Sequence, residues 1–180
     1  MSGDVVIALL LVFVTMQRLS ELVIARRNTR LLLAAGAHEI GAGHYRVMVV
    51  LHSCWLLALW AAWLMGRAEL QPGAACLYLL LQPLRFWTMA SLGRYWTTRI
   101  IVVPDAPLVR AGPYRYLRHP NYLIVVMEIL LLPLALGLWP LAVIFSLLNA
   151  AMLRHRLAVE GDSLRQRESA ADAASRCPIP

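Results

Sequence analysis

Five apolar runs, each close to the length of a membrane-spanning helix, dominate the sequence. They cover residues 5–24, 45–65, 73–92, 122–138 and 141–153. A helix needs about 20 apolar residues to cross a bilayer, with roughly 17–25 tolerated. The first three runs meet this length and the last two are shorter. The pattern predicts an all-α integral membrane protein with about five transmembrane helices.

The composition excludes an ordinary soluble domain. Apolar residues make up 60% of the 180-residue chain, whereas about 45–50% is usual in soluble proteins. This length favours a single domain over residues 1–180. The first run has no basic segment before it and no small-residue cleavage site after it, so we expect it to remain as a span.

The run boundaries divide this domain into four parts. Residues 1–92 hold three N-terminal spans, and residues 93–121 form the longest loop. Residues 122–160 hold the last two spans and the segment that follows them. Glycine and proline at 137–140 predict a tight turn that makes these spans a short helical hairpin. The polar tail, residues 161–180, is expected to extend the last helix.

Arginine supplies all of the basic charge, since the chain has no lysine and a formal net charge of +7. The arginines gather in the first and third connections and after the last span, whereas the second connection has only Arg67. Positive charge favours the cytosolic side. We therefore predict a multi-pass cell-membrane protein with its N-terminus outside and its C-terminus and basic loops in the cytosol. This clustering favours membrane topology over nucleic-acid binding, and the cysteine spacing predicts no metal site.

Each predicted span contains a polar residue at a similar depth. These residues are Arg18, His52, Arg85, Glu128 and Asn149. Each lies roughly 6–10 Å from the cytosolic end of its helix, at about 1.5 Å per residue. One interpretation is structural, with Arg18 paired to Glu21 and Arg85 paired to Glu128. Taken together, five such residues favour a lined cavity, because buried polar groups usually face a bundle interior or a water-filled space.

Helical spacing extends the polar layer toward the cytosol. Asn149, Arg156 and Glu160 fall at i, i+7 and i+11 and share one face of the last helix. Asn121 and Glu128 likewise share a face of the fourth helix. The sequence thus predicts two polar stripes that meet near Arg118.

The segment GPYRYLRHPNY, residues 112–122, resembles the signature of the isoprenylcysteine carboxyl methyltransferase family. These are integral membrane enzymes that use S-adenosylmethionine. Further blocks at residues 17–22, 27–28, 36–39, 44–45 and 94–98 look like the bacterial branch of the family, which includes alkylpyrone and alkylresorcinol O-methyltransferases. The resemblance covers roughly residues 15–165 and departs from the family at Gly161, where a second acid is expected after Glu160.

The resemblance implies a binding site for S-adenosylmethionine on a cytosolic loop and the C-terminal helix extension. The implied cofactor-binding residues are Tyr114, Arg118, His119, Pro120, Tyr122, Arg156 and Glu160. An arginine can bind the cofactor carboxylate in a bidentate manner. Glu160 suits the ammonium and ribose hydroxyls, and a tyrosine ring can stack on the adenine.

The expected reaction is O-methylation of a lipophilic acceptor at the cytosolic membrane face. Either an alkylpyrone- or alkylresorcinol-type hydroxyl or a prenylcysteine-type carboxylate is compatible, and the partners are this lipophilic or lipidated acceptor and membrane lipid. Arg118, His119 and Glu128 are the candidate catalytic residues. A phenol with a pKa of about 10 needs a base. His119 is the first candidate and could equally be structural, whereas His52 is interpreted as a layer residue.

Two other functions remain open at the level of sequence. A polar layer in five helices could line the path of a small multispan transporter. An inactive membrane scaffold is the other alternative, and Gly161 favours it.

Overall fold

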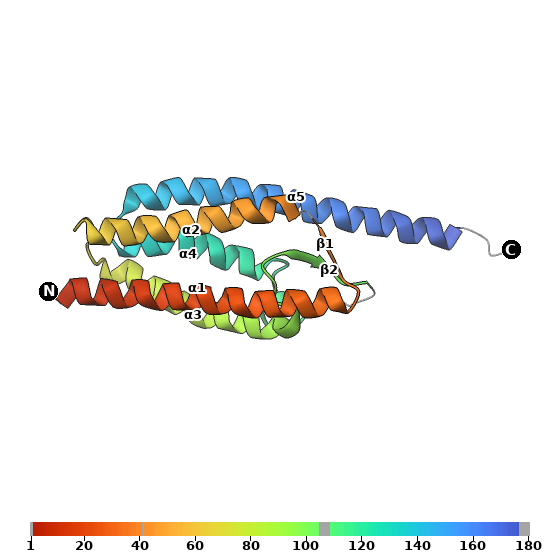
Figure 1. Ribbon diagram of the computed structural model, residues 1–180, viewed down its shortest axis with the longest axis horizontal. Helices are drawn as coiled ribbons and strands as arrows, with labels where there is room; N and C mark the ends of the chain where they lie inside the picture. The colour runs from red at the N-terminus through yellow and green to blue at the C-terminus, as the bar shows by residue number, and fades with distance from the viewer. Residues whose placement is uncertain (1, 41, 105–108, 177–180) are drawn as a thin grey trace.

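The computed structural model describes residues 2–40, 42–104 and 109–176, without the side chains of residues 2, 42, 44, 160 and 162–176. Within these ranges it contains five helices that run along one another as a bundle (Figure 1). They are α1 (Ser2–Ala34), α2 (Ala42–Leu64), α3 (Pro72–Leu92), α4 (Pro120–Ala135) and α5 (Trp139–Arg176). Two short 3₁₀ helices, η1 (Gly93–Tyr95) and η2 (Gly112–Arg115), lie between α3 and α4.

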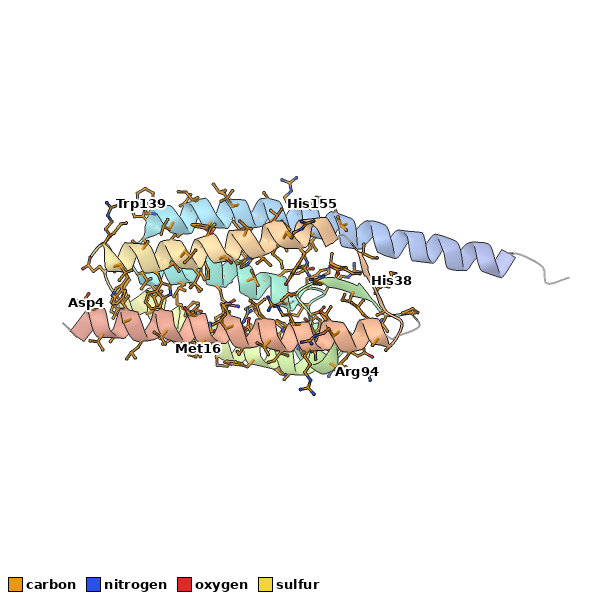
Figure 2. All side chains as sticks on the ribbon, in the orientation of Figure 1. Asp4, Met16, His38, Arg94, Trp139 and His155 are labelled. Atoms are coloured by element: carbon orange, nitrogen blue, oxygen red, sulfur yellow. The ribbon has the colours of Figure 1, made fainter. Side chains whose placement is uncertain are left out.

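Three helices are long and apolar enough to cross a membrane, judged by length and composition over the described residues. They are the segments Gly3–Ala34, Tyr45–Leu64 and Trp139–Val159 of α1, α2 and α5. Large apolar side chains project outward from these helices, including Met16 and Trp139 (Figure 2). These features agree with a membrane protein. The crossing of the membrane by α3 and α4 remains a prediction.

Helix α4 lies at the centre of the bundle and packs mainly against α3 and α5. It has 16 residues, or about 24 Å at 1.5 Å per residue, which is shorter than the roughly 30 Å hydrocarbon core. Half of its residues are buried, among them Ile124, Glu128 and Leu132. Because protein covers much of its surface, α4 can hold a carboxylate that a lipid-facing helix could not.

The turn between α4 and α5 confirms the predicted hairpin. Gly137 has φ of 70°, a conformation that glycine adopts without a steric penalty. The backbone N–H of Leu138 donates to the carbonyl of Pro133 at 2.8 Å, and the N–H of Gly137 donates to Leu134 at 3.0 Å. These bonds satisfy carbonyls that the end of α4 would otherwise leave free.

The first and last helices are longer than predicted, and the last span is not short. Helix α1 reaches Ala34 and α5 continues to Arg176, so the expected helical extension of the tail is confirmed over the described residues. The ends of apolar runs mark where polarity changes, whereas arginine, alanine and glutamate continue a helix readily. In α1, Asn28 continues the helix into a tertiary contact, because its amide donates to the carbonyls of Gly93 and Trp96 at 3.1 and 2.9 Å.

A two-stranded antiparallel ribbon joins the first and third connections, which the all-α prediction did not include. Strands β1 (His38–Ile40) and β2 (Ile100–Val102) pair His38 with Val102 and Ile40 with Ile100. Figure 1 shows the ribbon at the end of the bundle from which α5 extends, hereafter the ribbon end. Three residues per strand are too few for an alternating pattern to emerge from the sequence.

Candidate functional site

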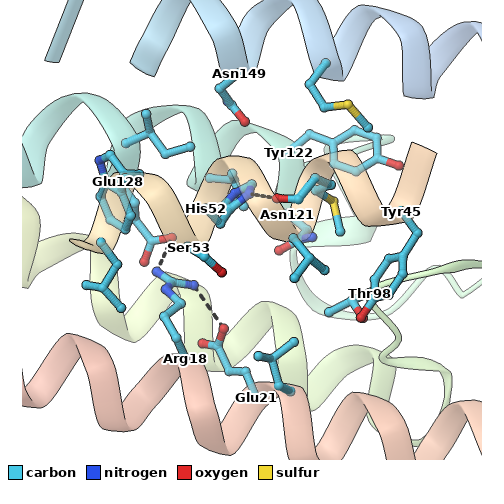
Figure 3. A pocket seen from close by; sticks show the side chains of 18 of the residues that line it. Arg18, Glu21, Tyr45, His52, Ser53, Thr98, Asn121, Tyr122, Glu128 and Asn149 are labelled. Atoms are coloured by element: carbon cyan, nitrogen blue, oxygen red, sulfur yellow. Dashed lines mark hydrogen bonds and ion pairs between the residues drawn. The ribbon is translucent and has the colours of Figure 1, made fainter. Parts of the chain in front are cut away.

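One cavity of about 250 Å³ receives residues from all five helices. Every residue of the predicted polar layer lines it: Arg18 of α1, His52 of α2, Arg85 of α3, Glu128 of α4 and Asn149 of α5. Figure 3 shows four of them around the same space. The similar depth inferred from the separate spans therefore corresponds to one shared location.

Two arginines and two glutamates, here called the buried quartet, form the inner wall of this cavity. Arg18 contacts Glu21 at 2.9 Å and Glu128 at 2.8 Å. Arg85 donates from Nε to Glu21 and from Nη1 to Glu128, both at 2.5 Å, and its Nη2 also contacts Glu21. Each arginine thus bridges both carboxylates, and the quartet has no net formal charge.

The quartet unites the two interpretations of the polar layer. The pairs Arg18–Glu21 and Arg85–Glu128 both exist, and the same residues line the cavity. Glu128 is 1% exposed and Arg85 is 4% exposed. Burial of such charges is tolerated only with close partners and satisfied hydrogen bonds. Gln82 adds a bond to Glu128 at 3.3 Å and accepts one from Gln17 at 2.8 Å.

His52 lies on the α2 side of the cavity with a defined hydrogen bond. Its Nδ1 is 2.8 Å from the backbone carbonyl of Met48, one helical turn earlier. A carbonyl can only accept, so the proton of this bond is on Nδ1. Nε2 has no hydrogen-bond partner within the described residues and is not among the buried unpaired polar atoms.

Arg156 closes the part of the cavity nearest the ribbon end, hereafter the mouth. Its Nε donates to the Tyr122 hydroxyl at 3.0 Å, and its Nη1 donates to the carbonyl of Thr98 at 3.0 Å. Nη1 also lies 3.0 Å from the sulfur of Met48. Arg156 therefore connects α5 with α4, α2 and the loop. Sequence analysis named Arg156 and Tyr122 as candidate site residues but did not name Met48 or Thr98.

The ribbon fixes the loop side of the mouth. Arg99, next to Thr98, donates to Glu39 of β1 at 2.6 Å and lies 4.5 Å from the centre of the Tyr45 ring. The hydrogen bond to Glu39 raises the pKa of Arg99 above its ordinary value. The Tyr45 hydroxyl is 3.3 Å from the hydroxyl of Thr98. The resemblance blocks at 36–39, 44–45 and 94–98 contained most of these residues, without showing that they meet.

The RHPNY residues surround the start of α4, and only some of them reach the cavity. Pro120 begins the helix, where its missing N–H removes no hydrogen bond. Tyr122 lines the cavity, and the His119 ring stacks on it with centroids 5.1 Å apart. Arg118 and His119 are exposed and do not line the cavity.

Two further implied cofactor residues lie elsewhere in the fold. Tyr114 is half-buried in η2. Glu160 lies on α5, and its side chain is outside the described residues.

Three buried polar atoms on lining residues have no hydrogen-bond partner in the described part of the chain. They are Oδ1 of Asn121, Nε1 of Trp96 and Nε1 of Trp55. Such groups are normally paired in native proteins. Asn121 belongs to the predicted α4 stripe, whereas Trp96 was known from the sequence only as part of the resemblance block at residues 94–98.

Comparison with known proteins identifies the family. The sequence profile of the isoprenylcysteine carboxyl methyltransferase (ICMT) family matches residues 74–166, which include α3 from residue 74, the α3–α4 loop, α4, and α5 as far as residue 166. This chain belongs to the ICMT family. Membership implies a membrane methyltransferase.

Two relatives extend the comparison. The uncharacterized protein YpbQ of Bacillus subtilis (strain 168) is 37% identical over 161 residues, covering 88% of this chain and 96% of that protein. An uncharacterized protein of Haemophilus influenzae is 28% identical over 109 residues, covering 58% of this chain and 63% of that protein. No solved structure matches. The YpbQ similarity extends beyond the ICMT profile, whose matched residues exclude α1 and α2.

Proposed function

We propose that this ICMT-family protein transfers a methyl group from S-adenosylmethionine to an oxygen atom of a lipophilic acceptor at the cytosolic membrane face. The supporting observation is a single cavity that combines a neutral ionic wall with residues of the RHPNY segment and α5 at its mouth. The acceptor carries an alkylpyrone- or alkylresorcinol-type hydroxyl or a prenylcysteine-type carboxylate. The orientation follows the positive charge of the ribbon end, with the N-terminus outside.

The residues around the mouth fit the chemistry of the cofactor. S-adenosylmethionine has an ammonium and ribose hydroxyls, which are donors that the unpaired Oδ1 of Asn121 could accept. The exposed guanidinium of Arg118 is available to the cofactor carboxylate. The Tyr45 ring lines the mouth and offers the adenine the face opposite Arg99, and Tyr122, on whose ring His119 stacks, also lines the mouth. Glu160 completes the proposed set from α5.

Bound S-adenosylmethionine supplies an electrophilic methyl group on a sulfonium. The residues of this chain align the acceptor oxygen with that group and exclude water. Correct alignment of two reactants can lower a barrier by about 7–11 kcal/mol. The buried quartet holds α1, α3 and α4 in fixed positions around the acceptor end of the cavity. Glu128 belongs to this wall, so we propose that it positions the acceptor.

The packing argues against a transport path. Beyond the quartet, the described helices close on an apolar cluster that includes Leu11, Val14, Leu59 and Leu132, each fully buried. Transporters of known design place unwound helix breaks near the midplane. Here α1 and α2 are continuous helices through the cavity region.

The test uses the full chain in lipid nanodiscs with S-adenosylmethionine labelled in its methyl group. An alkylresorcinol, an alkylpyrone, a farnesylcysteine and phosphatidylethanolamine are offered as acceptors, and products are analysed by mass spectrometry. We expect one lipophilic oxygen acceptor to gain a CH₂ unit and to carry the label. Absence of label in every acceptor, together with absence of cofactor binding by calorimetry, would contradict the proposal.

The cofactor site has its own variants. Arg118→Ala and Glu160→Ala are each expected to weaken S-adenosylmethionine binding at least tenfold, which corresponds to about 1.4 kcal/mol. Arg94→Ala is the matched control, since that guanidinium contacts Tyr95 of its own turn. Unchanged affinity in both site variants would remove these two residues from the proposed site.

A further inference from the structure

We propose that His52 of α2 is the residue that accepts the proton of a hydroxyl acceptor during methyl transfer. The inference rests on the proposed function and deepens it, because it assigns the base. It reverses the interpretation of His52 as a layer residue and replaces His119 as the first candidate.

The position of His52 fits a group that touches the acceptor. On α2 the lining residues Tyr45, Met48 and His52 follow one another from the mouth inward. On α4 Tyr122 and Glu128 do the same. Figure 3 shows His52 between the Glu128 side and the Tyr122 side of the cavity. A cofactor held at the mouth and an acceptor held against the quartet would therefore meet beside His52.

The hydrogen bond to Met48 determines which ring nitrogen can act. Nδ1 carries a proton and donates a hydrogen bond to the Met48 carbonyl at 2.8 Å. In a neutral His52 the basic lone pair is therefore on Nε2. This bond also fixes the orientation of the ring on its helix. His52 is half-buried and lines the cavity, and its Nε2 is not among the buried atoms that lack a partner in the described part of the chain. In the proposal, Nε2 meets the acceptor from the cavity side. The arrangement is that of a base oriented by a second hydrogen bond.

None of the charged side chains described around the cavity makes a hydrogen bond or ion pair with His52. The charged and titratable groups that line the same cavity are Arg18 and Glu21 from α1, Tyr45 from α2, Arg85 from α3, Glu128 and Tyr122 from α4, and Arg156 from α5. The buried quartet pairs internally, and Arg156 bonds Tyr122 and Thr98. No carboxylate among the described residues makes a hydrogen bond to His52.

The proposed step balances in atoms and charge. The acceptor oxygen forms a bond to the methyl carbon as the bond from that carbon to sulfur breaks. The hydroxyl proton moves to Nε2 of His52. The positive charge that the methyl sulfonium donor carried is then on the imidazolium, which retains its Nδ1 bond to Met48. Release of that proton to water through the mouth restores the neutral ring.

His119 is a weaker candidate because of its location. It is exposed, precedes α4 and stacks on Tyr122 outside the set of lining residues. A base must lie within hydrogen-bond reach of the proton that it removes, or act through one water. From its observed position, His119 faces solvent at the ribbon end.

The decisive variant is His52→Asn. The asparagine amide can still donate a hydrogen bond to the Met48 carbonyl, but it has no basic nitrogen. Two acceptors are compared: an alkylresorcinol, and the same molecule with a ring nitro group that ionises the hydroxyl at the assay pH. We expect the variant to lose about 10²–10⁴-fold in methyl transfer to the alkylresorcinol, the usual contribution of a general base. It should lose less than tenfold with the nitrated acceptor, which needs no base.

The pH profile provides a second signature. Activity of the wild type on the alkylresorcinol should level off once His52 is neutral, whereas the activity of His52→Asn should continue to rise as the acceptor itself ionises. His38→Asn on the exposed edge of β1 is the matched control and should follow the wild type. Equal losses on both acceptors, with a parallel pH profile, would show a structural role and overturn the proposal.

Two measurements do not depend on turnover. Nitrogen NMR of histidine-labelled wild type should assign the proton of His52 to Nδ1, and addition of alkylresorcinol should shift its Nε2 signal. Calorimetry should give the same affinity of wild type and His52→Asn for sinefungin, a non-reactive cofactor analogue. A proton on Nε2 in the wild type would overturn the proposal even if the variant failed to fold.

The outcomes separate the two levels of inference. If the wild type binds no cofactor and methylates no acceptor, the proposed function fails. If the wild type methylates the alkylresorcinol and His52→Asn does so at the same rate, the proposed function stands and the role of His52 is wrong.

Discussion

Arg85 is tightly held within the polar layer by residues of two other helices. It is 4% exposed, and its three guanidinium nitrogens contact two carboxylates on two different helices. The planar guanidinium fits several carboxylate oxygens at once, which a lysine ammonium cannot do with the same geometry. A sequence with arginine as its only strongly basic residue suits this arrangement.

Arg85→Gln should therefore destabilise the protein strongly. Removal of one partner from a buried ionic group leaves charge uncompensated and costs about 3–5 kcal/mol. The free energy of unfolding, measured by reversible denaturation in mixed micelles, reports the loss. Arg99→Gln is the control, because the Arg99–Glu39 pair is partly exposed and such pairs contribute about 0–1 kcal/mol. Similar losses in both variants would contradict a special role for the quartet.

Gly112 is a residue whose backbone and surroundings both disfavour a side chain. Its φ is 56°, and a Cβ there would overlap the Ser91 hydroxyl and lie 3.0 Å from Nε1 of Trp87. Gly112 begins η2, which carries Tyr114. The geometry of this turn thus depends on α3.

Gly112→Ala should reduce stability more than Gly66→Ala. Both glycines have positive φ, which costs a non-glycine residue about 1–2 kcal/mol, but a Cβ added at Gly66 would meet no atom within 4 Å. The difference between the two variants measures the overlap with Ser91. Thermal unfolding in detergent gives both values, and Ser91→Gly should partly rescue Gly112→Ala but not Gly66→Ala. Equal destabilisation without rescue would count against the contact.

Helix α5 connects the segments that surround the mouth of the cavity. Through Arg156 it contacts the hydroxyl of Tyr122, the carbonyl of Thr98 and the sulfur of Met48. Three segments that are far apart in the sequence therefore meet at one guanidinium. The RHPNY segment and the α5 stripe were recognised separately, and this side chain connects them.

Arg156→Met should weaken this junction, whereas Arg154→Met should not. Hydrogen bonds to charged groups contribute about 1.5–3 kcal/mol, so we expect a loss in that range for Arg156→Met. Arg154 is exposed one position before His155, and surface substitutions usually change stability by about 0.5 kcal/mol or less. Chemical denaturation measures both, and cofactor affinity should fall only in the first. A matching loss in Arg154→Met would show that α5 is merely sensitive to lost charge.

The whole molecule has a strongly asymmetric distribution of positive charge. The last turns of α1, the α3–α4 loop and the α5 extension hold most of the arginines, and they lie at the ribbon end (Figure 1). The connection between α2 and α3 at the opposite end contains Arg67 alone. The backbone of this connection is hydrogen-bonded to the end of α4. The N–H of Glu69 donates to the carbonyl of Leu136, and the N–H of Gln71 donates to the carbonyl of Ala135.

This asymmetry predicts the orientation in the membrane. Alkaline phosphatase fused after residue 68 should be active, because that connection is expected outside, and a green fluorescent protein fused to the C-terminus should fluoresce in the cytosol. Phosphatase fused within the α3–α4 loop is the internal control and should be inactive. The reverse pattern of activities would refute both the orientation and the proposed cytosolic access to the cofactor.

Much of the helical framework could be predicted because its signal is local. Long apolar runs indicate helices, and Gly137 with Pro140 indicates the hairpin turn. The β1–β2 ribbon could not be predicted, because three-residue strands have no periodicity and their pairing joins segments about 60 residues apart. The choice between ion pairs and a cavity also depended on distances between helices.

The sequence alone determined that this is a helical membrane protein of the ICMT family, since hydropathy and short motifs depend on residue order. It also placed one polar residue at a similar depth in each span. Only the tertiary structure decided how those residues combine: Arg85 bridges Glu21 and Glu128, Arg118 and His119 stay outside the cavity, and His52 lines it with Nδ1 bonded to Met48. These outcomes depend on the rotation and packing of helices about their axes, which the order of residues in any one helix does not specify.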